Sequence, residues 1–363
     1  MVAIATHRAP TRLAGAAAPE PSSSMPQLFG APRTLAPMSV EALAAATGES
    51  FPAITNARER TARGLAERRA RLDGVVLDPD ASVVLLGSWG RHEVTSASDD
   101  DAIVLFCGTR RDHVRPEPGQ VANLLGGPAP GPEGLFGATA WLADLADNVG
   151  LDGDTNTILT RRMLFLLESV PVAGEAAYAA ARDGLLATYL AAHERDYRPP
   201  RFLLNDLVRY WRTIAVDFEG KHRARAGEGW GLRHAKLRFS RKVLFAGGLL
   251  PVLACHALTA AEMPAFLAQR LAEPPLDRVA RAFLDHGMAD AGARALRAYC
   301  AFLDLLDDAQ ARTHLAGLSE AEAEASETFL RVREHGDELQ AALLALLFED
   351  PELERLVRDY LIF

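Results

Sequence analysis

The chain has little cysteine and no long apolar run, and both absences narrow its class. Its three cysteines, Cys107, Cys255 and Cys300, stand far apart in 363 residues. Their spacing fits neither a zinc site nor a disulfide framework, which favours a reducing, cytoplasmic location. No apolar run approaches the ~20 residues of a membrane span, so no membrane partner is expected. The formal charge of −9 argues against a protein that coats nucleic acid with its whole surface.

Regular patterning begins only after residue 38. Residues 1–38 are rich in Ala, Pro and Ser and lack periodicity, so we expect a disordered tail. Helices are expected over Val40–Thr47 and Phe51–Leu72, where apolar residues recur three or four apart. From Pro199 onward we find only helical patterns. The sequence therefore predicts an α+β protein, with a small α/β domain over 39–172 and an all-helical domain over 173–363.

The middle of the predicted α/β domain has a less regular pattern. Arg110–Gly137 is rich in proline and glycine, which predicts an irregular or inserted segment. Ala138–Val149 and Leu159–Ser169 have helical patterns. Pro171–Gly174 reads as a turn before the next helix. These assignments leave only two strands in the domain.

Those two strands flank a glycine turn. Val83–Leu86 and Ala102–Phe106 are short apolar runs of the kind that form buried strands. The first ends in Gly87 and Ser88, with Gly90 two residues further on. Glycine has no Cβ, so backbone N–H groups in such a turn can approach a phosphate closely. The turn therefore indicates a phosphate-binding site.

An acidic cluster follows the turn and precedes the second strand. Asp99 and Asp101 alternate with Asp100, so on an extended chain they point to one face and Asp100 to the other. Two adjacent carboxylates repel each other unless a cation neutralises them. Mg²⁺, or Mn²⁺ in its place, is the expected cation, because Mg²⁺ prefers a few carboxylates together with substrate phosphates.

The turn and the acidic cluster together resemble a known catalytic pattern. The letters GSWGRHE at 87–93 and SDDD at 98–101 resemble the motif of the DNA polymerase beta-type nucleotidyltransferase superfamily. They are most similar to the bacterial branch of nitrogen-regulatory uridylyltransferases and glutamine synthetase adenylyltransferases. The resemblance implies that Ser88 and the glycine turn hold a triphosphate and that Asp99 and Asp101 hold the metals. It also implies a short mixed sheet flanked by helices, with further helices closing over the nucleotide.

The family's third acidic residue has no clear counterpart. In the superfamily it lies on a later strand and often activates the acceptor. Asp154 is the best candidate, because residues 154–157 and the turn before 175 resemble the uridylyltransferase segment, although the arginine of that turn is missing. Asp152 and Asp144 are rivals. An equal alternative is that Asp152 and Asp154 only shape a loop.

A basic segment over 209–242 is the second charged feature. It holds ten Lys or Arg against three acids, a local charge of +7 in a chain of −9. Such a concentration indicates contact with a triphosphate or another nucleic-acid-like anion. Arg212 and Lys236 are the candidate phosphate ligands here, although any single residue of the segment is more simply a solvated helix face.

Arg91 has two interpretations. It can contact phosphate from its place in the glycine turn, or it can pair with Glu93 or an active-site aspartate. The sequence gives the ion pair at least equal weight.

These features predict a Mg²⁺-dependent nucleotidyltransferase. It would move a nucleoside monophosphate from an NTP such as ATP to a hydroxyl of a protein, RNA or small molecule, and release pyrophosphate. The sequence leaves open the acceptor, the base and the oligomeric state. The alternative is a non-catalytic module that binds a nucleotide or a partner, as in a signalling or toxin–antitoxin complex.

Overall fold

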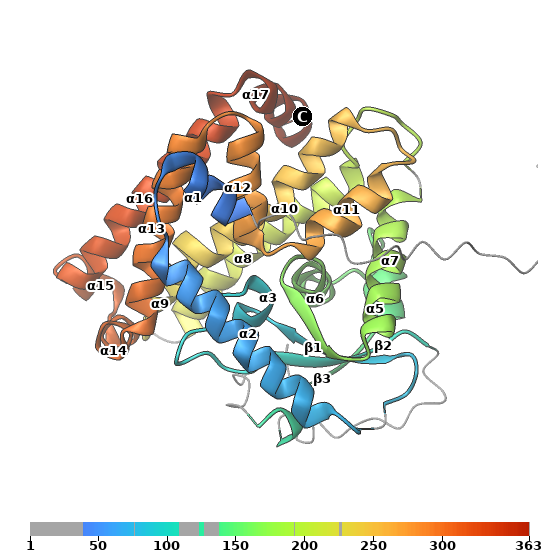
Figure 1. The fold of residues 1–363 in the computed structure, drawn as a ribbon, viewed down its shortest axis with the longest axis horizontal. Helices are drawn as coiled ribbons and strands as arrows, with labels where there is room; N and C mark the ends of the chain where they lie inside the picture. Colours follow the sequence, from blue (N-terminus) through green and yellow to red (C-terminus); the bar gives the residue numbers. More distant parts are fainter. Residues whose placement is uncertain are drawn as a thin grey trace, which may run out of the picture. The chain divides into compact units, whose positions relative to one another are not determined.

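A computed structural model describes residues 39–75, 77–108, 123–126, 138–191, 193–224 and 227–362. The predicted tail (1–38) and most of the predicted insert (110–137) lie outside the described residues. The protein is α+β, with a small sheet in the lower part of the view and many helices around and above it (Figure 1). The strands are β1 (Ala81–Leu86), β2 (Ala102–Phe106), β3 (Ala138–Trp141) and β4 (Ser169–Ala173).

Helices occupy most of the described chain. Around the strands in sequence lie α1 (Ser39–Thr47), α2 (Pro52–Leu72), α3 (Ser88–Arg91), α5 (Leu142–Ala146), α6 (Asn156–Leu167) and α7 (Glu175–Leu190). The remainder is helical in its described part, with α8 (Arg201–Ala224), α9 (Trp230–Lys236), α10 (Lys242–Ala254), α11 (Met263–Ala272), α12 (Pro275–Asp285), α13 (Ala289–Asp307), α14 (Ala309–Gly317), α15 (Glu320–Ala323), α16 (Glu327–Phe348) and α17 (Pro351–Val357). In the part of the chain that the structure describes, no helix combines the length and apolar character needed to cross a bilayer.

The four strands form one mixed sheet in the order β3-β2-β1-β4. β1 pairs antiparallel with β2 and with β4, whereas β2 pairs parallel with β3. Both predicted strands are therefore central in the sheet. The Leu86 N–H donates to the Asp101 carbonyl at 2.8 Å, which joins the end of β1 to the start of β2.

Both faces of the sheet are covered, which explains the apolar runs at 83–86 in β1 and 102–106 in β2. Val84 and Leu105 belong to the larger core, which they share with the helices of the C-terminal part. Val83 and Val104 belong to a second core, where Leu65 of α2 packs against the opposite face. All residues of β1 and β2 are buried.

Two predicted assignments were wrong, and each concealed an outer strand. Ala138–Trp141 is strand β3, although the pattern predicted a helix over Ala138–Val149. Ser169–Ala173 is strand β4, although its proline predicted a turn. Proline is tolerated there because β4 is an edge strand and the register shifts opposite Pro171.

The boundary predicted between residues 172 and 173 stays a prediction. Residues 37–363 form one compact unit. Helix α2, from the first predicted domain, packs against β4 and also against α13 of the second. Sheet and helical layers therefore meet over an extensive interface, and the candidate site lies at that interface.

Candidate functional site

The glycine turn brings β1, the acidic cluster and β4 together. Gly87 has a φ of +65°, and a Cβ there would lie 3.1 Å from Oδ2 of Asp101. Gly90 is even more confined, because its Cβ would lie 2.0 Å from the carbonyl oxygen of Glu168. Glycine at 87 is therefore favoured by backbone conformation, and glycine at 90 is required by the close approach of another backbone segment.

The three consecutive aspartates face opposite sides, as their alternation predicts. Asp100 is buried and accepts from Nε and Nη2 of Arg68, with contacts between 2.7 and 3.1 Å. The Arg68 guanidinium also lies 3.9 Å above the Trp89 ring. The indole N–H of Trp89 donates to the Asp99 carbonyl at 3.0 Å. This arrangement leaves the side chains of Asp99 and Asp101 to line a pocket on the other side.

That pocket, called here the aspartate pocket, has a volume of about 110 Å³. One wall comes from the glycine turn and the acidic cluster, and the other from α9, α13, α14 and the segment between α9 and α10. Its polar lining consists of Ser88, Arg91, Glu93, Thr95, Ser98, Asp99, Asp101, Lys236, Ser240, Arg241 and Arg312. The predicted residues Gly87, Ser88, Arg91, Asp99, Asp101 and Lys236 all reach this pocket, whereas Gly90 supports it from behind.

Negative charge is concentrated at Asp101. Burial and the nearby charges of Asp99 and Glu168 together raise the pKa of its carboxyl to about 7. The positive charges of Arg241 and Arg91 lower this pKa, but by less than burial and the negative charges raise it. Neither Asp99 nor Asp101 has an ion-pair partner among the described residues. The pocket therefore holds two carboxylates whose mutual repulsion the neighbouring arginines offset only in part.

A buried network of ion pairs lies beside these carboxylates. Arg91 donates to Glu93 at 2.9 Å and to Glu168, so it forms the predicted Arg91–Glu93 pair. Glu168 is 1% exposed and also accepts from Arg241 at 3.1 Å. The Tyr299 hydroxyl donates to Glu93 at 2.7 Å. Neither Glu168 nor Arg241 is among the predicted site residues, because residues from four separate segments meet here without a local motif.

A π-helical turn supplies the basic wall. Residues Leu237–Arg241 form this turn between α9 and α10. A π turn bonds residues five apart, which suits the placing of Lys236 and Arg241 at the same pocket. Partial desolvation in the pocket lowers the pKa of Lys236, and the positive charge of Arg241 lowers it further. Lys236 forms no ion pair with a described residue, so it presents its charge to the pocket.

The structure does not bring Asp154 into the aspartate pocket. Asp154 is buried and accepts from Arg162 at 2.9 and 3.0 Å and from Arg209 at 2.8 Å. Burial opposes its ionisation, but these bonds outweigh burial and lower the pKa of Asp154. Arg162 also donates to Asp206 at 2.6 Å, which joins α6 to α8. These contacts favour the structural alternative for Asp154.

The remaining candidates also lie elsewhere. Arg212 is exposed and does not line the pocket, and neither do Asp144 or Asp152. Several other cations of the basic segment are paired, for example Arg238 with Asp337. The high charge of 209–242 is therefore distributed over several separate contacts, of which Lys236 and Arg241 face the pocket.

The acidic pair fits a divalent cation of the magnesium type. Within the described ranges, no group of three or more His, Cys, Asp or Glu side chains is arranged as a metal site. Mg²⁺ usually binds proteins through one or two carboxylates and keeps water or phosphate as its other ligands. Asp99 and Asp101 supply two carboxylates of this kind in the same pocket.

Comparison with known proteins gives no independent assignment. No family model, curated protein or solved structure matches the chain.

The three cysteines are free thiols, in line with their spacing.

Proposed function

We propose that the protein is a Mg²⁺- or Mn²⁺-dependent nucleotidyltransferase. The observation that carries the proposal is the composition of the aspartate pocket. Asp99 and Asp101 on one wall share it with Lys236 and Arg241 on the other, more than 130 residues later in the chain. Carboxylates for a metal and cations for phosphate oxygens are the two requirements of a metal–triphosphate complex.

The residues have distinct roles in this proposal. The turn from Gly87 to Gly90 lets backbone N–H groups approach the phosphates, and Ser88 adds a hydroxyl. Lys236 and Arg241 contact phosphate oxygens. Asp99 and Asp101 would hold the metal, which when bound neutralises phosphate charge and polarises the reacting phosphorus.

The size of the pocket indicates which part of the nucleotide it encloses. A cavity of about 150 Å³ holds one benzene molecule, so about 110 Å³ suits a phosphate group and not a whole nucleotide. In the reaction, an acceptor hydroxyl oxygen bonds to the α-phosphorus, the bond to the bridging oxygen breaks, and pyrophosphate leaves. The hydroxyl proton passes to water, because Asp154 and Glu168 already accept from two arginines each.

The acceptor is a hydroxyl of a protein, an RNA or a small molecule. We also propose a cytoplasmic location, since three free thiols suit a reducing compartment.

The test is pyrophosphate release from each of the four NTPs with Mg²⁺ or Mn²⁺. α-Labelled nucleotide in cell lysate then identifies the acceptor class. We expect release by the wild type and at least a hundredfold loss in Asp99→Asn and Asp101→Asn. Asp152→Asn is the matched control, because Asp152 is exposed and outside the pocket. Nucleotide binding without pyrophosphate release would instead support the non-catalytic binding module.

A further inference from the structure

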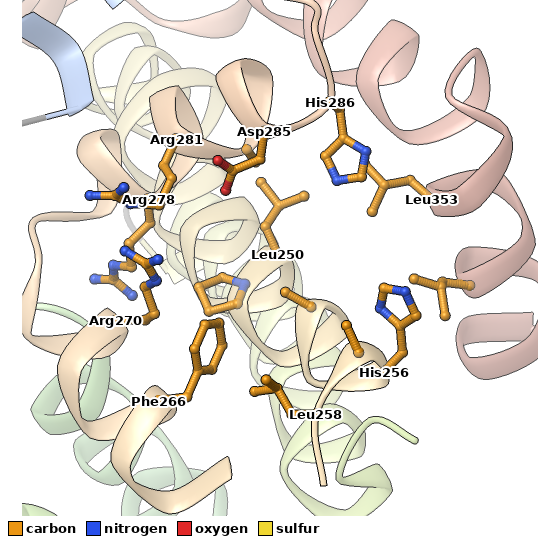
Figure 2. Close-up of a pocket in the computed structure, with 15 residues that line it drawn as sticks. Leu250, His256, Leu258, Phe266, Arg270, Arg278, Arg281, Asp285, His286 and Leu353 are labelled. Atoms are coloured by element: carbon orange, nitrogen blue, oxygen red, sulfur yellow. The ribbon is translucent and has the colours of Figure 1, made fainter. Parts of the chain in front are cut away.

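A second pocket lies among the C-terminal helices and shares no lining residue with the aspartate pocket. It is formed by α10, α11, α12 and α17 and has a volume of about 210 Å³ (Figure 2). Most of its wall is apolar, with Leu250, Pro251, Phe266 and Leu353 among the lining residues. This lining suits a ligand with an apolar body.

Three arginines line one side of this pocket. Figure 2 shows Arg270, Arg278 and Arg281 together, across the pocket from the two histidines. Arg270 and Arg281 both bond to Glu273, at 3.0 and 3.3 Å. One carboxylate is thus shared by two guanidinium groups, which leaves a net positive charge on this side of the pocket.

Arg278 adds a buried charge. It is 2% exposed and has no ion-pair partner among the described residues. Nη1 donates to the Gly247 carbonyl at 3.0 Å, and Nη2 donates to the Leu167 carbonyl. Neither carbonyl has a helical N–H partner. The residue four positions after Gly247 is Pro251, which has no N–H, and Leu167 is the last residue of α6. These bonds explain the position of Arg278 but leave its charge without a carboxylate, and its buried Nε has no hydrogen-bond partner.

The other charged residues of the pocket do not supply that carboxylate. His256 contacts Glu352 at 2.7 Å and His286 contacts Asp350 at 3.1 Å, so both histidines are engaged. Asp285 lines the pocket without an ion pair to a described residue. The carboxylates of Asp285 and Glu273 do not balance the three arginines, so the arginine side keeps a net positive charge.

We propose that this pocket binds a small apolar carboxylate, with its carboxylate on the Arg270, Arg278 and Arg281 side and its body against Leu250 and Phe266. The volume sets the size, because a benzene-sized body needs about 150 Å³ and the pocket offers about 210 Å³. A planar carboxylate matches the fork of guanidinium donors. An ammonium group on the ligand, as in an apolar amino acid, would face Asp285.

The test is isothermal titration of the full chain with phenylacetate and hexanoate. The neutral controls are 2-phenylethanol and hexanol, and phenylalanine tests the contribution of an ammonium group. We expect each carboxylate to bind at least tenfold more tightly than its alcohol. Phenylalanine binding more tightly than phenylacetate identifies an amino-acid ligand, and weaker binding identifies a simple carboxylate; both support the proposal.

A pocket-filling variant locates the binding. Ala254 lines the pocket and is exposed, so Ala254→Phe fills the space without changing charge or the core. We expect this variant to fold normally by circular dichroism and to lose at least tenfold in carboxylate affinity. Arg281→Gln should bind the carboxylates several-fold more weakly than the wild type. No binding by any of the carboxylates at millimolar concentration, equal binding of the alcohols, or unchanged binding by Ala254→Phe would overturn the proposal. None of these results depends on nucleotidyl transfer.

Discussion

Asp100 and Asp101 are neighbours in the chain, but replacement of each by asparagine is expected to change stability in opposite directions. Asp101 is ionised only at a cost, because burial and the charges of Asp99 and Glu168 raise its pKa to about 7. The ordinary pKa of an aspartate in an unfolded chain is 3.8. Between these values the folded protein binds more protons than the unfolded chain. This group therefore favours folding below pH 3.8, and that contribution is lost as the pH rises through 7.

The magnitude follows from the size of that interval. Between pH 5 and pH 7 the wild type loses about 1.4 kcal/mol of folding stability per pH unit through Asp101, or about 2.7 kcal/mol in all. Solvent screening in the partly open pocket reduces this to roughly 1–2 kcal/mol. Asp101→Asn has no carboxyl to ionise, so its stability relative to the wild type should rise by this amount from pH 5 to pH 8. Asp100→Asn breaks a buried pair with Arg68 and should lose about 3–5 kcal/mol at every pH in this range.

The assay is urea unfolding followed by circular dichroism at pH 5, 6, 7 and 8, in EDTA and again with Mg²⁺. In EDTA the wild-type and Asp101→Asn curves should diverge as the pH rises. With Mg²⁺ at pH 8 the wild type should gain stability and Asp101→Asn should not, since binding to the folded state alone is stabilising. Parallel pH profiles for the two proteins in EDTA would refute the assigned electrostatics of Asp101. An equal gain with Mg²⁺ would refute its role as a metal ligand.

Three further predictions address other parts of the site. Gly90→Ala should lower the stability of the fold by about 2 kcal/mol or more, because the new Cβ would lie 2.0 Å from the Glu168 backbone. Transfer activity should fall with it. Unchanged urea unfolding would contradict this. Asp154→Asn should destabilise the fold by about 2–4 kcal/mol through Arg162, yet its folded fraction should retain kcat; a folded but inactive protein would restore Asp154 as a catalytic candidate. Lys236→Ala should raise the KM for NTP at least tenfold at constant melting temperature, and an unchanged KM would remove it from the phosphate site.

The features that the sequence predicted well are local ones. The turn at 87–90 and the alternation of Asp99 to Asp101 depend on residues within one short stretch, and the structure arranges them as that stretch predicts. The two central strands were also predicted, because a strand covered on both faces is apolar at every position. The outer strands were missed for the opposite reason: β3 contains alanines that suit a helix, and β4 contains a proline that only an edge position tolerates.

The partners of charged residues could not be predicted in the same way. Asp154 and Glu168 are both acids near the end of the predicted α/β domain, and a sequence motif favoured Asp154. Their surroundings come from distant segments, with Arg209 reaching one and Arg241 the other. Both arginines belong to the same basic segment, so composition alone predicted an anion site without its position.

The π turn decides which cations of that segment reach the proposed metal site. In a regular helix, Lys236 and Arg241 would differ by five residues and about 140° around the axis. The π turn over Leu237–Arg241 reduces this angle, and both residues line the pocket of Asp99 and Asp101. Arg241 remains attached to Glu168 while Lys236 stays unpaired, so one cation is fixed in place and the other is free to follow a phosphate. In the proposed reaction, which binds a triphosphate and releases pyrophosphate, the fixed charge of Arg241 would orient the phosphates and the adjustable charge of Lys236 would follow them.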